Sequence, residues 1–516
     1  MRLRMSRQLH PRVQAGLRHL PHRRPHHDGA RCAGGTAART CGRGDGVRPR
    51  GAGELSARTT LPAHDRNIDD QRHRRGRCMQ LRYSIITVAL AAWIGLPGAT
   101  ASTLPAPDGA YAVGLLRTEF ADTARPLDAG KPDSGPRRLP AVVWYPAEAR
   151  PSAEGQPYLE DAVAATTLPA ITRNFRYADG DLHALAAARI AVHPGARPAK
   201  TKRGFPVVVY SHGLFLYPEQ NSVLAAHLAS HGYIVVSIAH PGDSTDVRLQ
   251  DGTLVATQFG GTPDDPRFGE AWKVIAGGAD LAVRRDALAT YADAFPATRI
   301  GRSFAAWRDD TIAVADAIVA RKEPAALRKI LATADRTRLA FAGMSFGGAT
   351  SATTCHRVTA CRAAVNLDGQ NFDPALFDRA VGRPLLLMLS DWPRYGLLEG
   401  QPREPDFSPN DLAYEPWAST GRNDDVVRVR LEGIRHLGFT DLVALLDGPK
   451  RQERVGDIDG GQALATINDV VLAFLDAYMR DGDAAGLGRA IDRRPALKRH
   501  VPTRMQRWAG ENAETR

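Results

Sequence analysis

The residues with the clearest chemical potential form a short glycine-rich motif around one serine. Gly343, Ser345 and Gly347 have the spacing G-x-S-x-G, directly after the apolar run RLAFA and directly before the helix-like run GATSATT. A strand that turns sharply into a helix needs glycines at these two places, and the turn presents the serine hydroxyl beside free helix N–H groups. This context predicts that Ser345 is a nucleophile.

A serine hydroxyl needs a histidine base at neutral pH, and an acid must orient that base. In a strand-turn-helix site the histidine follows the serine in the chain, where only His356, His436 and His500 occur. His356 lies in the helix after Ser345, and we expect it to point away. His500 lies near the C-terminal end. His436 lies in the loop after the strand-like run VVRVRL, so it is the predicted base.

Two aspartates compete for the role of the acid. Asp368 follows the apolar run AAVNL, and Asp391 follows LLLMLS. Both are expected at the carboxyl ends of strands, the edge at which sites form in parallel sheets. Their positions alone leave both open. Trp392 precedes Pro393, which favours an extended backbone, so we expect Trp392 to form a wall of the pocket.

The charge that develops on an ester carbonyl oxygen during attack needs two backbone N–H donors, which together form an oxyanion hole. The residue after the nucleophile, Phe346, is expected to supply one donor. The second is expected from Leu214, because the run VVVYS continues into His212-Gly213-Leu214. His212 and His240 both precede the nucleophile, and we interpret them as structural residues of their loops.

Short apolar runs alternate with helix-like segments across residues 102–480, which predicts an α/β domain with a mostly parallel central sheet and helices on both faces. Residues 243–302 are longer than an ordinary connection and are predicted to form an insertion or a cap. Residues 481–516 are polar and basic and are predicted to be a frayed C-terminal tail. Strands are expected at 141–145, 205–210, 233–238, 339–343, 363–367, 385–389 and 427–431, and helices at 220–231, 303–321, 441–446 and 462–479.

The positive charge of the chain is concentrated at its N-terminal end. The whole sequence has a net charge of +12, and residues 1–78 hold 18 Arg, no Lys and 6 acidic residues, so the remainder is neutral overall. Binding to nucleic acid needs a basic face on the fold, so no nucleic-acid partner is expected. Residues 1–78 show no helical or strand period. We predict a disordered extension, with translation in the cell beginning at Met79.

Residues 79–101 have the layout of a secretory signal peptide. Arg82 precedes the 12 uncharged residues Ile85–Leu96, and Ala99-Thr100-Ala101 has the form of a cleavage site. The apolar run is shorter than the roughly 20 residues that a membrane span requires. We therefore expect cleavage before Ser102, no integral membrane span, and a periplasmic or secreted protein.

Removal of residues 1–101 would leave two cysteines, Cys355 and Cys361. Cysteines tend to pair in an oxidising compartment, so a local disulfide is predicted, and two free buried thiols are the alternative. His356 is the one neighbouring residue that could bind a metal with them. No metal site and no cofactor are predicted.

Several stretches together resemble the platelet-activating-factor acetylhydrolases of the plasma, or isoform II, type and their bacterial relatives in the α/β-hydrolase superfamily. They are FPVVVYSHGL, LAAHLASHGYIVVSIAH, GMSFGG, AVNLDG and GIRHLGFTD. The resemblance covers roughly residues 110–446. It implies an α/β-hydrolase fold and a serine esterase that acts on short or oxidised acyl chains, without a metal or a cofactor.

The resemblance also implies a role for individual residues. It gives Ser345 as the nucleophile, His436 as the base, Asp368 rather than Asp391 as the acid, and the N–H groups of Leu214 and Phe346 as the oxyanion donors. Gly369 after Asp368 supports this choice of acid, because glycine lets the chain turn sharply and present the carboxylate at the rim of the sheet.

The function expected from these features is a secreted or periplasmic hydrolase of small-molecule or lipid esters that forms an acyl-enzyme. The fold alone leaves dienelactone-hydrolase-like, cutinase-like and peptidase activities open. A non-catalytic binding protein with this fold is a remote alternative, since both the nucleophile and the base are present. Met344 and the segment 243–302 depart from the vertebrate pattern, so the acyl length and the headgroup stay open.

Overall fold

The computed structural model describes residues 104–148, 155–178, 180–259, 265–277, 280–396, 403–419, 425–480 and 482–513, all within the compact unit Trp93–Arg516. The predicted extension at 1–78 and the predicted signal peptide at 79–101 lie outside the described residues. Within the described ranges, no helix combines the length and the apolar character needed to cross a bilayer.

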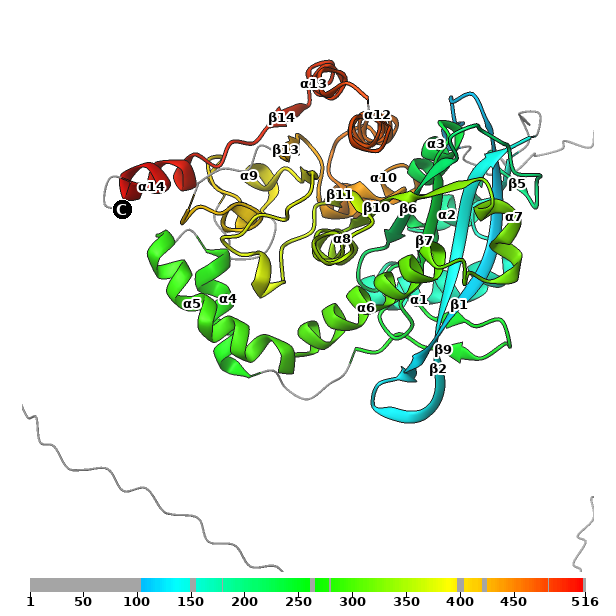
Figure 1. Ribbon diagram of the computed structural model, residues 1–516, viewed down its shortest axis with the longest axis horizontal. Helices are drawn as coiled ribbons and strands as arrows, with labels where there is room; N and C mark the ends of the chain where they lie inside the picture. The colour runs from blue at the N-terminus through cyan, green and yellow to red at the C-terminus, as the bar shows by residue number, and fades with distance from the viewer. Residues whose placement is uncertain are drawn as a thin grey trace, which may run out of the picture. The chain divides into compact units, whose positions relative to one another are not determined.

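One ten-stranded sheet forms the centre of the described domain (Figure 1). Its strand order is β14-β13-β12-β11-β10-β6-β7-β2-β1-β5. The strands from β13 to β7 run parallel to one another, whereas the pairs β14–β13, β7–β2 and β2–β1 are antiparallel. The prediction of a mostly parallel sheet is confirmed. The strands are β1 (Ala112–Asp128), β2 (Lys131–Ala147), β5 (His193–Pro194), β6 (Phe205–Ser211), β7 (Ile234–Ile238), β10 (Ala334–Met344), β11 (Cys361–Leu367), β12 (Leu385–Leu389), β13 (Val426–Leu431) and β14 (Leu497–Arg499).

Helices surround this sheet, and four two-residue strands lie outside it. The helices are α1 (Asp161–Phe175), α2 (His183–Ala187), α3 (Ser222–Ser230), α4 (Pro266–Ala276), α5 (Leu281–Ala294), α6 (Arg299–Val319), α7 (Arg328–Leu331), α8 (Phe346–Arg357), α9 (Trp392–Tyr395), α10 (Leu442–Leu445), α11 (Lys450–Val455), α12 (Gly460–Met479), α13 (Ala484–Asp492) and α14 (Thr503–Ala513). The short strands are β3 (Gln156–Pro157), β4 (Arg189–Ile190), β8 (Val247–Arg248) and β9 (Leu254–Val255).

Both faces of the sheet are buried, which explains why the central strands are apolar throughout. Val208 and Ala340 belong to a core that includes residues of α3 and α12. Val207 and Phe341, their neighbours in the chain, point to the opposite face and belong to a core with α6 and α8. In Figure 1, α3 and α12 accordingly lie on one side of the sheet, and α6 and α8 lie on the other.

The segment 243–302, predicted to be an insertion or a cap, is largely helical in its described parts. It contains α4, α5 and the start of α6, and α4 packs on α5. The side chains of Asp265, Asp280 and Thr298 each accept a hydrogen bond from the backbone at the start of the helix that follows, as helix caps do. The cap on α6 lets this helix begin at Arg299, four residues before the predicted start.

Residues 482–513 do not form the frayed tail that we predicted. They form α13, β14 and α14, and β14 adds an antiparallel strand beside β13. Leu487 and Ile491 are buried one helical turn apart on α13, and His500 is buried against Asp411, with Nε2 2.9 Å from Oδ1. The segment is polar on average, but its few apolar residues are spaced so that one side of α13 packs on the domain.

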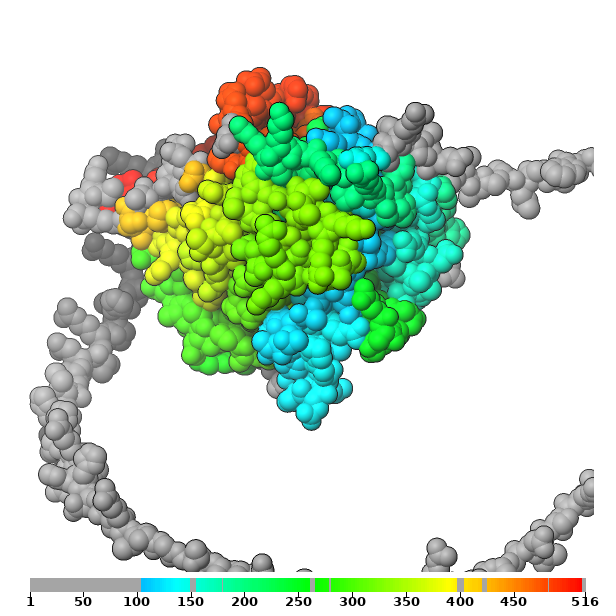
Figure 2. Space-filling model, turned by 45° about the vertical axis from the view of Figure 1, so that its right-hand side comes forward, coloured from blue at the N-terminus to red at the C-terminus, as the bar shows by residue number. Residues whose placement is uncertain are grey.

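The long hairpin of β1 and β2 was predicted only at residues 141–145. The two strands pair from Ala112 opposite Ala147 to Asp128 opposite Lys131. The outer half of the hairpin is largely exposed and rich in charged residues and prolines, which hides the alternation that identifies a strand. In Figure 2 this blue hairpin projects from the surface of the domain.

Candidate active site

The serine of the G-x-S-x-G motif lies in a sharp turn between β10 and α8. Ser345 has φ 56° and ψ −120°, a backbone conformation that is strained for a residue with a side chain. A Cβ atom at Gly343 would collide with the backbone of Gly347, and one at Gly347 would collide with the carbonyl oxygen of Ser211 at the end of β6. Both glycines are therefore required by the close packing of the turn.

Ser345, His436 and Asp368 form one hydrogen-bonded chain at the carboxyl edge of the sheet. His436 Nε2 lies 2.7 Å from Ser345 Oγ, and His436 Nδ1 lies 2.7 Å from Asp368 Oδ2. The side chain of Asp368 is only 2% exposed, whereas that of His436 is 37% exposed. The second oxygen of Asp368 accepts a hydrogen bond from the Ser390 N–H at 2.7 Å. A fixed, buried carboxylate behind an accessible imidazole lets the histidine take the serine proton.

The sheet topology explains how these residues meet. Ser345 follows β10 and Asp368 follows β11, the adjacent parallel strand. His436 begins the short 3₁₀ helix His436–Phe439, which comes after β13. Carboxyl ends of parallel strands share one edge of a sheet, so three distant segments of the chain converge there.

Asp391, the alternative acid, has other partners. One of its carboxylate oxygens pairs with Arg430, and the other accepts a hydrogen bond from the Gly433 N–H at 2.9 Å. Gly433 lies in the loop that leads to His436, so Asp391 holds this loop. The structure thus brings Asp368, and not Asp391, within hydrogen-bond distance of the imidazole.

Trp392 is a core residue and does not line the cavity at Ser345, contrary to our expectation. Its side chain lies edge to face with His500, at 5.0 Å between ring centroids, and its Nε1–H donates to the Glu404 carbonyl at 3.2 Å. Pro393 does not extend the chain here. It lies in the first turn of α9, where a proline is well accommodated, and Trp392 begins this helix.

Leu214 and Phe346, the predicted oxyanion donors, both border Ser345 and line its cavity. Phe346 is the first residue of α8, so its N–H has no acceptor within the helix. The loop of Leu214 lies against Ser345, since a Cβ added at Gly213 would be 3.5 Å from the Ser345 Cβ. The Gly213 N–H donates to Gln220 Oε1 at 2.9 Å, which fixes this loop.

A cavity of about 210 Å³ opens at the serine and the histidine. Three of its wall residues, Ile300 of α6, Gln370 and Phe372, were not predicted. Phe372 stacks on Trp272 of α4, with ring centroids 5.5 Å apart, so α4 supports this wall. The nearness of Phe372 to Asp368 in the chain was a usable signal for it, whereas nothing local marks Ile300. The complete lining is Leu214, Ile300, Ser345, Phe346, Asp368, Gln370, Phe372 and His436.

A second serine–histidine–aspartate array lies beside the loop His212-Gly213-Leu214. His240 Nε2 lies 3.1 Å from Ser211 Oγ, and His240 Nδ1 lies 3.0 Å from Asp310 Oδ2. Arg137 donates two hydrogen bonds to Asp310, at 3.0 and 2.7 Å. His240 and Asp310 are both 0% exposed, so an ester cannot reach this array. It supports Ser211, whose carbonyl packs against Gly347.

The buried charges of this array are electrostatically balanced. Burial opposes ionisation of Asp310, but the charge of Arg137 and the bonds from Arg137 and His240 outweigh it and lower the pKa of Asp310. Burial also lowers the pKa of His240, and burial together with the nearby His240 lowers that of His212 to about 3. His212 Nε2 lies 2.8 Å from Ser244 Oγ, and Nδ1 lies 2.7 Å from the Gly213 carbonyl. Both histidines are therefore neutral parts of the framework.

Asp441 secures the segment that carries His436. Its Oδ2 accepts hydrogen bonds from the Val223 N–H of α3 at 3.1 Å and from the Tyr158 hydroxyl at 2.9 Å. Burial raises the pKa of Asp441 to about 7, although these hydrogen bonds act in the opposite direction. The carboxyl group therefore changes charge near neutral pH.

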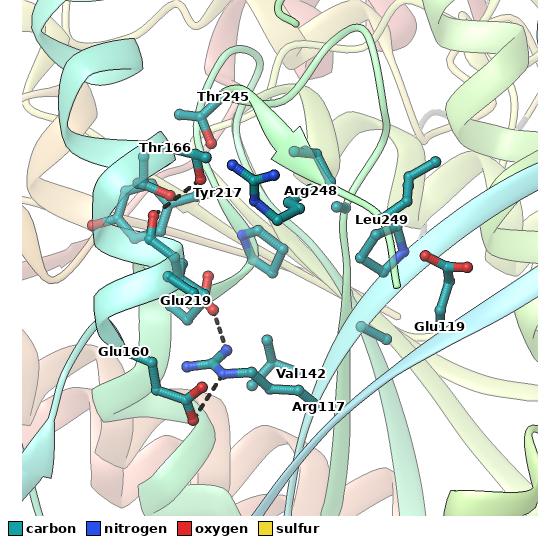
Figure 3. A pocket seen from close by; sticks show the side chains of 18 of the residues that line it. Arg117, Glu119, Val142, Glu160, Thr166, Tyr217, Glu219, Thr245, Arg248 and Leu249 are labelled. Carbon is teal, nitrogen blue, oxygen red and sulfur yellow. Dashed lines mark hydrogen bonds and ion pairs between the residues drawn. The ribbon is translucent and has the colours of Figure 1, made fainter. Parts of the chain in front are cut away.

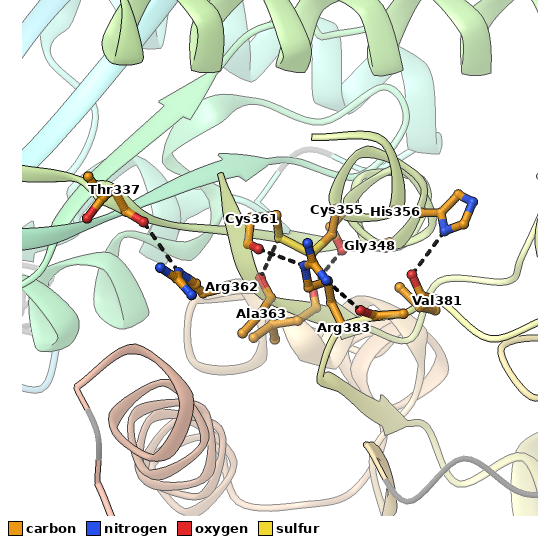
Figure 4. The surroundings of a disulfide bond; sticks show 12 residues. Thr337, Gly348, Cys355, His356, Cys361, Arg362, Ala363, Val381 and Arg383 are labelled. Atoms are coloured by element: carbon orange, nitrogen blue, oxygen red, sulfur yellow. Dashed lines mark hydrogen bonds between the residues drawn. A yellow bond between two sulfur atoms is a disulfide. The ribbon is translucent and has the colours of Figure 1, made fainter. Parts of the chain in front are cut away.

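A disulfide joins Cys355, near the end of α8, to Cys361, at the start of β11, with a Cα–Cα distance of 5.2 Å (Figure 4). These are the helix that follows Ser345 and the strand that precedes Asp368. The predicted pairing is thus present in the structure. His356 does not line the cavity at Ser345, and its Nδ1 lies 2.9 Å from the Val381 carbonyl, as Figure 4 shows.

A larger cavity, of about 270 Å³, lies between α1 and the β1–β2 hairpin (Figure 3). Arg117 forms ion pairs there with Glu160 and Glu219. None of the residues predicted from the sequence to act in catalysis lines this cavity.

Comparison with known proteins gives two sequence matches. Residues 99–252 match the sequence model of the family described as platelet-activating factor acetylhydrolase, isoform II. The chain is also 24% identical over 297 residues to the platelet-activating factor acetylhydrolase of Canis lupus familiaris. The predicted resemblance is confirmed. This alignment covers 55% of the chain and 59% of the dog protein, and the family match ends before Ser345.

A solved structure supports the fold. The ferulic acid esterase from Streptomyces cinnamoneus superposes with a TM-score of 0.56, covering 78% of this chain and all of the esterase, at 22% sequence identity. Together with the mostly parallel sheet and the strand-turn-helix serine, this likeness shows the α/β-hydrolase fold. At this identity it bears on the fold alone.

Proposed function

We propose that the protein is a serine carboxylic-ester hydrolase that cleaves short-chain acyl esters. The observation that carries the proposal is the continuous hydrogen-bonded chain from Ser345 through His436 to the buried Asp368. The amides of Leu214 and Phe346, which border the serine, support it, and so does the resemblance to platelet-activating factor acetylhydrolase.

In the first half of the reaction, His436 Nε2 takes the proton of Ser345 as Oγ attacks the ester carbonyl carbon. Asp368 keeps the hydrogen on His436 Nδ1 and stabilises the imidazolium. The carbonyl oxygen becomes negative and accepts hydrogen bonds from the Leu214 and Phe346 amides. When this intermediate collapses, the ester C–O bond breaks, and the imidazolium gives its proton to the departing alcohol.

In the second half, water attacks the acyl group on Ser345. His436 takes a proton from this water, the oxyanion forms again at the same two amides, and the bond from the carbonyl carbon to Ser345 Oγ breaks. The imidazolium then returns its proton to Ser345. The products are the carboxylic acid and the free enzyme.

The size of the cavity supports a short acyl group. Its volume of about 210 Å³ is below the roughly 300–1,000 Å³ typical of sites for drug-sized ligands. Leu214, Ile300 and Phe372 supply apolar walls. Phe372 also contacts the rings of Phe346, at 5.5 Å, and Trp272, at 5.5 Å, so an aromatic acyl group such as that of a ferulate ester is the second candidate.

The decisive experiment combines a serine-directed fluorophosphonate with a panel of substrates. The panel contains p-nitrophenyl esters of increasing acyl length, an acetylated phospholipid, methyl ferulate and a peptide anilide. We expect the probe to modify Ser345 and kcat/KM to fall as the acyl chain lengthens. Ser345→Ala should abolish labelling and lower kcat by about 10⁴–10⁶-fold.

Ser351→Ala is the matched control, because Ser351 lies on the same helix and its hydroxyl donates to the Gly348 and Val365 carbonyls, away from His436. It should keep both labelling and activity. Retention of activity in Ser345→Ala would show that another nucleophile acts. Absence of turnover across the whole panel would favour a binding protein, and cleavage of the anilide alone would favour a peptidase.

We also propose that the protein is exported to the periplasm or beyond. The layout of residues 79–101 supports this, and so does the Cys355–Cys361 disulfide, because disulfides persist in oxidising compartments. Mass analysis of protein exported by a Gram-negative host should give Ser102 as the first residue. Cytoplasmic protein that retains residues 1–78 would contradict the proposal.

A further inference from the structure

Two histidines and an aspartate meet at the C-terminal end of α3, outside the site described above. His227 and His231 are four residues apart, and their ring centroids lie 4.4 Å apart. Asp108 comes from the segment that leads into β1. Its Oδ1 lies 3.0 Å from His227 Nδ1 and 3.8 Å from His231 Nε2. One ligand atom from each residue lies within 4.8 Å of the other two.

This set of donor atoms matches the coordination chemistry of zinc. Zn²⁺ binds imidazole nitrogen and carboxylate oxygen at about 2.0–2.2 Å, and ligand atoms at the corners of such a tetrahedron lie roughly 3.4 Å apart. The observed separations of 3.0 and 3.8 Å fall on either side of this value. Residues four apart share one side of a helix, so both imidazoles reach the same point.

The arrangement is held in place by contacts other than a metal. His231 Nδ1 lies 3.0 Å from the His227 carbonyl, so Nδ1 carries the ring hydrogen and leaves the Nε2 lone pair facing Asp108. A hydrogen bond of this kind, from the second ring nitrogen to a carbonyl, orients most metal-binding histidines. His231 is therefore already in the tautomer that can bind a metal ion through Nε2.

Asp108 is positioned by the backbone that follows it. The Gly109 N–H donates to Ser230 Oγ at 3.1 Å, and the Tyr111 N–H donates to the Ser230 carbonyl at 3.0 Å. A Cβ at Gly109 would collide with the Ser230 backbone, so only glycine permits this close approach. The segment is thus docked on the end of α3, with the carboxylate beside the histidine pair.

We propose that Asp108, His227 and His231 bind one divalent transition-metal ion of the zinc class. The side chain of Asp108 is 74% exposed and that of His231 is 28% exposed, so the ion can enter from solvent, and water can fill the remaining positions. On binding, the hydrogen of His227 moves from Nδ1 to Nε2. The contact between His227 Nδ1 and Asp108 is then replaced by a bond from each of them to the ion, and no hydrogen bond at Nε2 is broken, since Nε2 has no partner among the described residues. The ion ties the segment before β1 to α3 and takes no part in ester hydrolysis.

The test compares the full chain, purified without an affinity tag, with three variants. His231→Ala and Asp108→Ala each remove one ligand, and His183→Ala removes an exposed histidine of α2 as the matched control. Zinc bound per chain is measured by equilibrium dialysis and elemental analysis. Histidines outside the described residues are common to all four proteins and cancel in the comparison.

We expect the wild type and His183→Ala to hold one more zinc equivalent than the other two variants, or to hold it at least tenfold more tightly. Zinc should also raise Tm further in these two proteins, because a ligand that binds only the folded state stabilises it. Mg²⁺ should not compete, since it prefers oxygen ligands.

Equal zinc binding in all four proteins would overturn the proposal, as would displacement of the ion by an equal concentration of Mg²⁺. His227 is nearly buried, so the test does not depend on replacing it. If His231→Ala fails to fold, the highly exposed Asp108 keeps the comparison decisive. Neither readout uses ester hydrolysis, so the result is independent of the proposed function.

Discussion

Replacing Asp368 with asparagine tests the carboxylate assigned to His436. In the structure, Asp368 Oδ2 lies 2.7 Å from His436 Nδ1, which keeps the ring hydrogen on Nδ1 and the lone pair on Nε2, facing Ser345. Asparagine has nearly the same shape, but its amide group can donate to Nδ1. The ring hydrogen then moves to Nε2, and the histidine can no longer accept the serine proton.

We expect kcat to fall by roughly 10⁴-fold in Asp368→Asn. Each tenfold change corresponds to about 1.36 kcal/mol, so the activation barrier rises by about 5.4 kcal/mol. This exceeds the roughly 1–3 kcal/mol of leaving one buried polar group without its partner. The difference arises because the variant loses both the correct tautomer and the charge that stabilises the imidazolium.

The assay is steady-state hydrolysis of p-nitrophenyl acetate, with Asp391→Asn as the matched control. Asp391 bonds to Arg430 and to the Gly433 N–H. Its replacement should therefore lower Tm while changing kcat by less than about tenfold. A loss smaller than tenfold in Asp368→Asn, or the reverse pattern in the two variants, would refute the assignment. The reverse pattern would also move the acid to the strand after β11.

Three further predictions concern stability. The pKa of Asp441 is about 7 in the folded protein and 3.8 ordinarily, so between these pH values the folded state holds a proton that the unfolded state releases. The unfolding free energy should therefore fall as pH rises from about 4 to 7. Asp441→Asn should flatten this fall, as measured by urea denaturation at several pH values. An equal dependence of the unfolding free energy on pH in the wild type and in Asp441→Asn would contradict this prediction. Cys355→Ser should lower the unfolding free energy by about 2 kcal/mol, because the bridged cysteines are only six positions apart, and the wild type should show no free thiol when denatured without reductant. His240→Ala should lower the unfolding free energy by about 1–3 kcal/mol, because the Ser211 hydroxyl and the Asp310 carboxylate each lose a buried hydrogen bond; an unchanged denaturation midpoint would argue against the buried array.

The parts of the site that the sequence indicated are those fixed by local backbone chemistry. A strand, a sharp turn and a helix leave few alternatives around Ser345, since the turn excludes side chains at Gly343 and Gly347. His436 could be selected because few histidines follow the serine. The choice between Asp368 and Asp391 rested on the resemblance, because both follow parallel strands and only the three-dimensional loop geometry distinguishes them.

The parts that were missed depend on packing between distant segments. Ile300 reaches the cavity because α6 begins at the Thr298 cap, and nothing near Ile300 in the sequence shows which side of the helix faces Ser345. Asp310 and His240 are 70 residues apart, and neither has a motif around it. The C-terminal helix α13 was missed because average polarity conceals a few periodic apolar residues.

The tight contact between Gly347 and the Ser211 carbonyl bears on how such a protein can be re-engineered. A library that randomises Gly343 and Gly347 would yield mainly misfolded proteins, because a side chain at either position would collide with the carbonyl oxygen at the end of β6. Ile300 and Phe372 reach the same cavity from outside the turn, so directed evolution of acyl selectivity should begin there. Ile300→Ala would lengthen the accepted chain while Ser345 and its amide donors stay where they are.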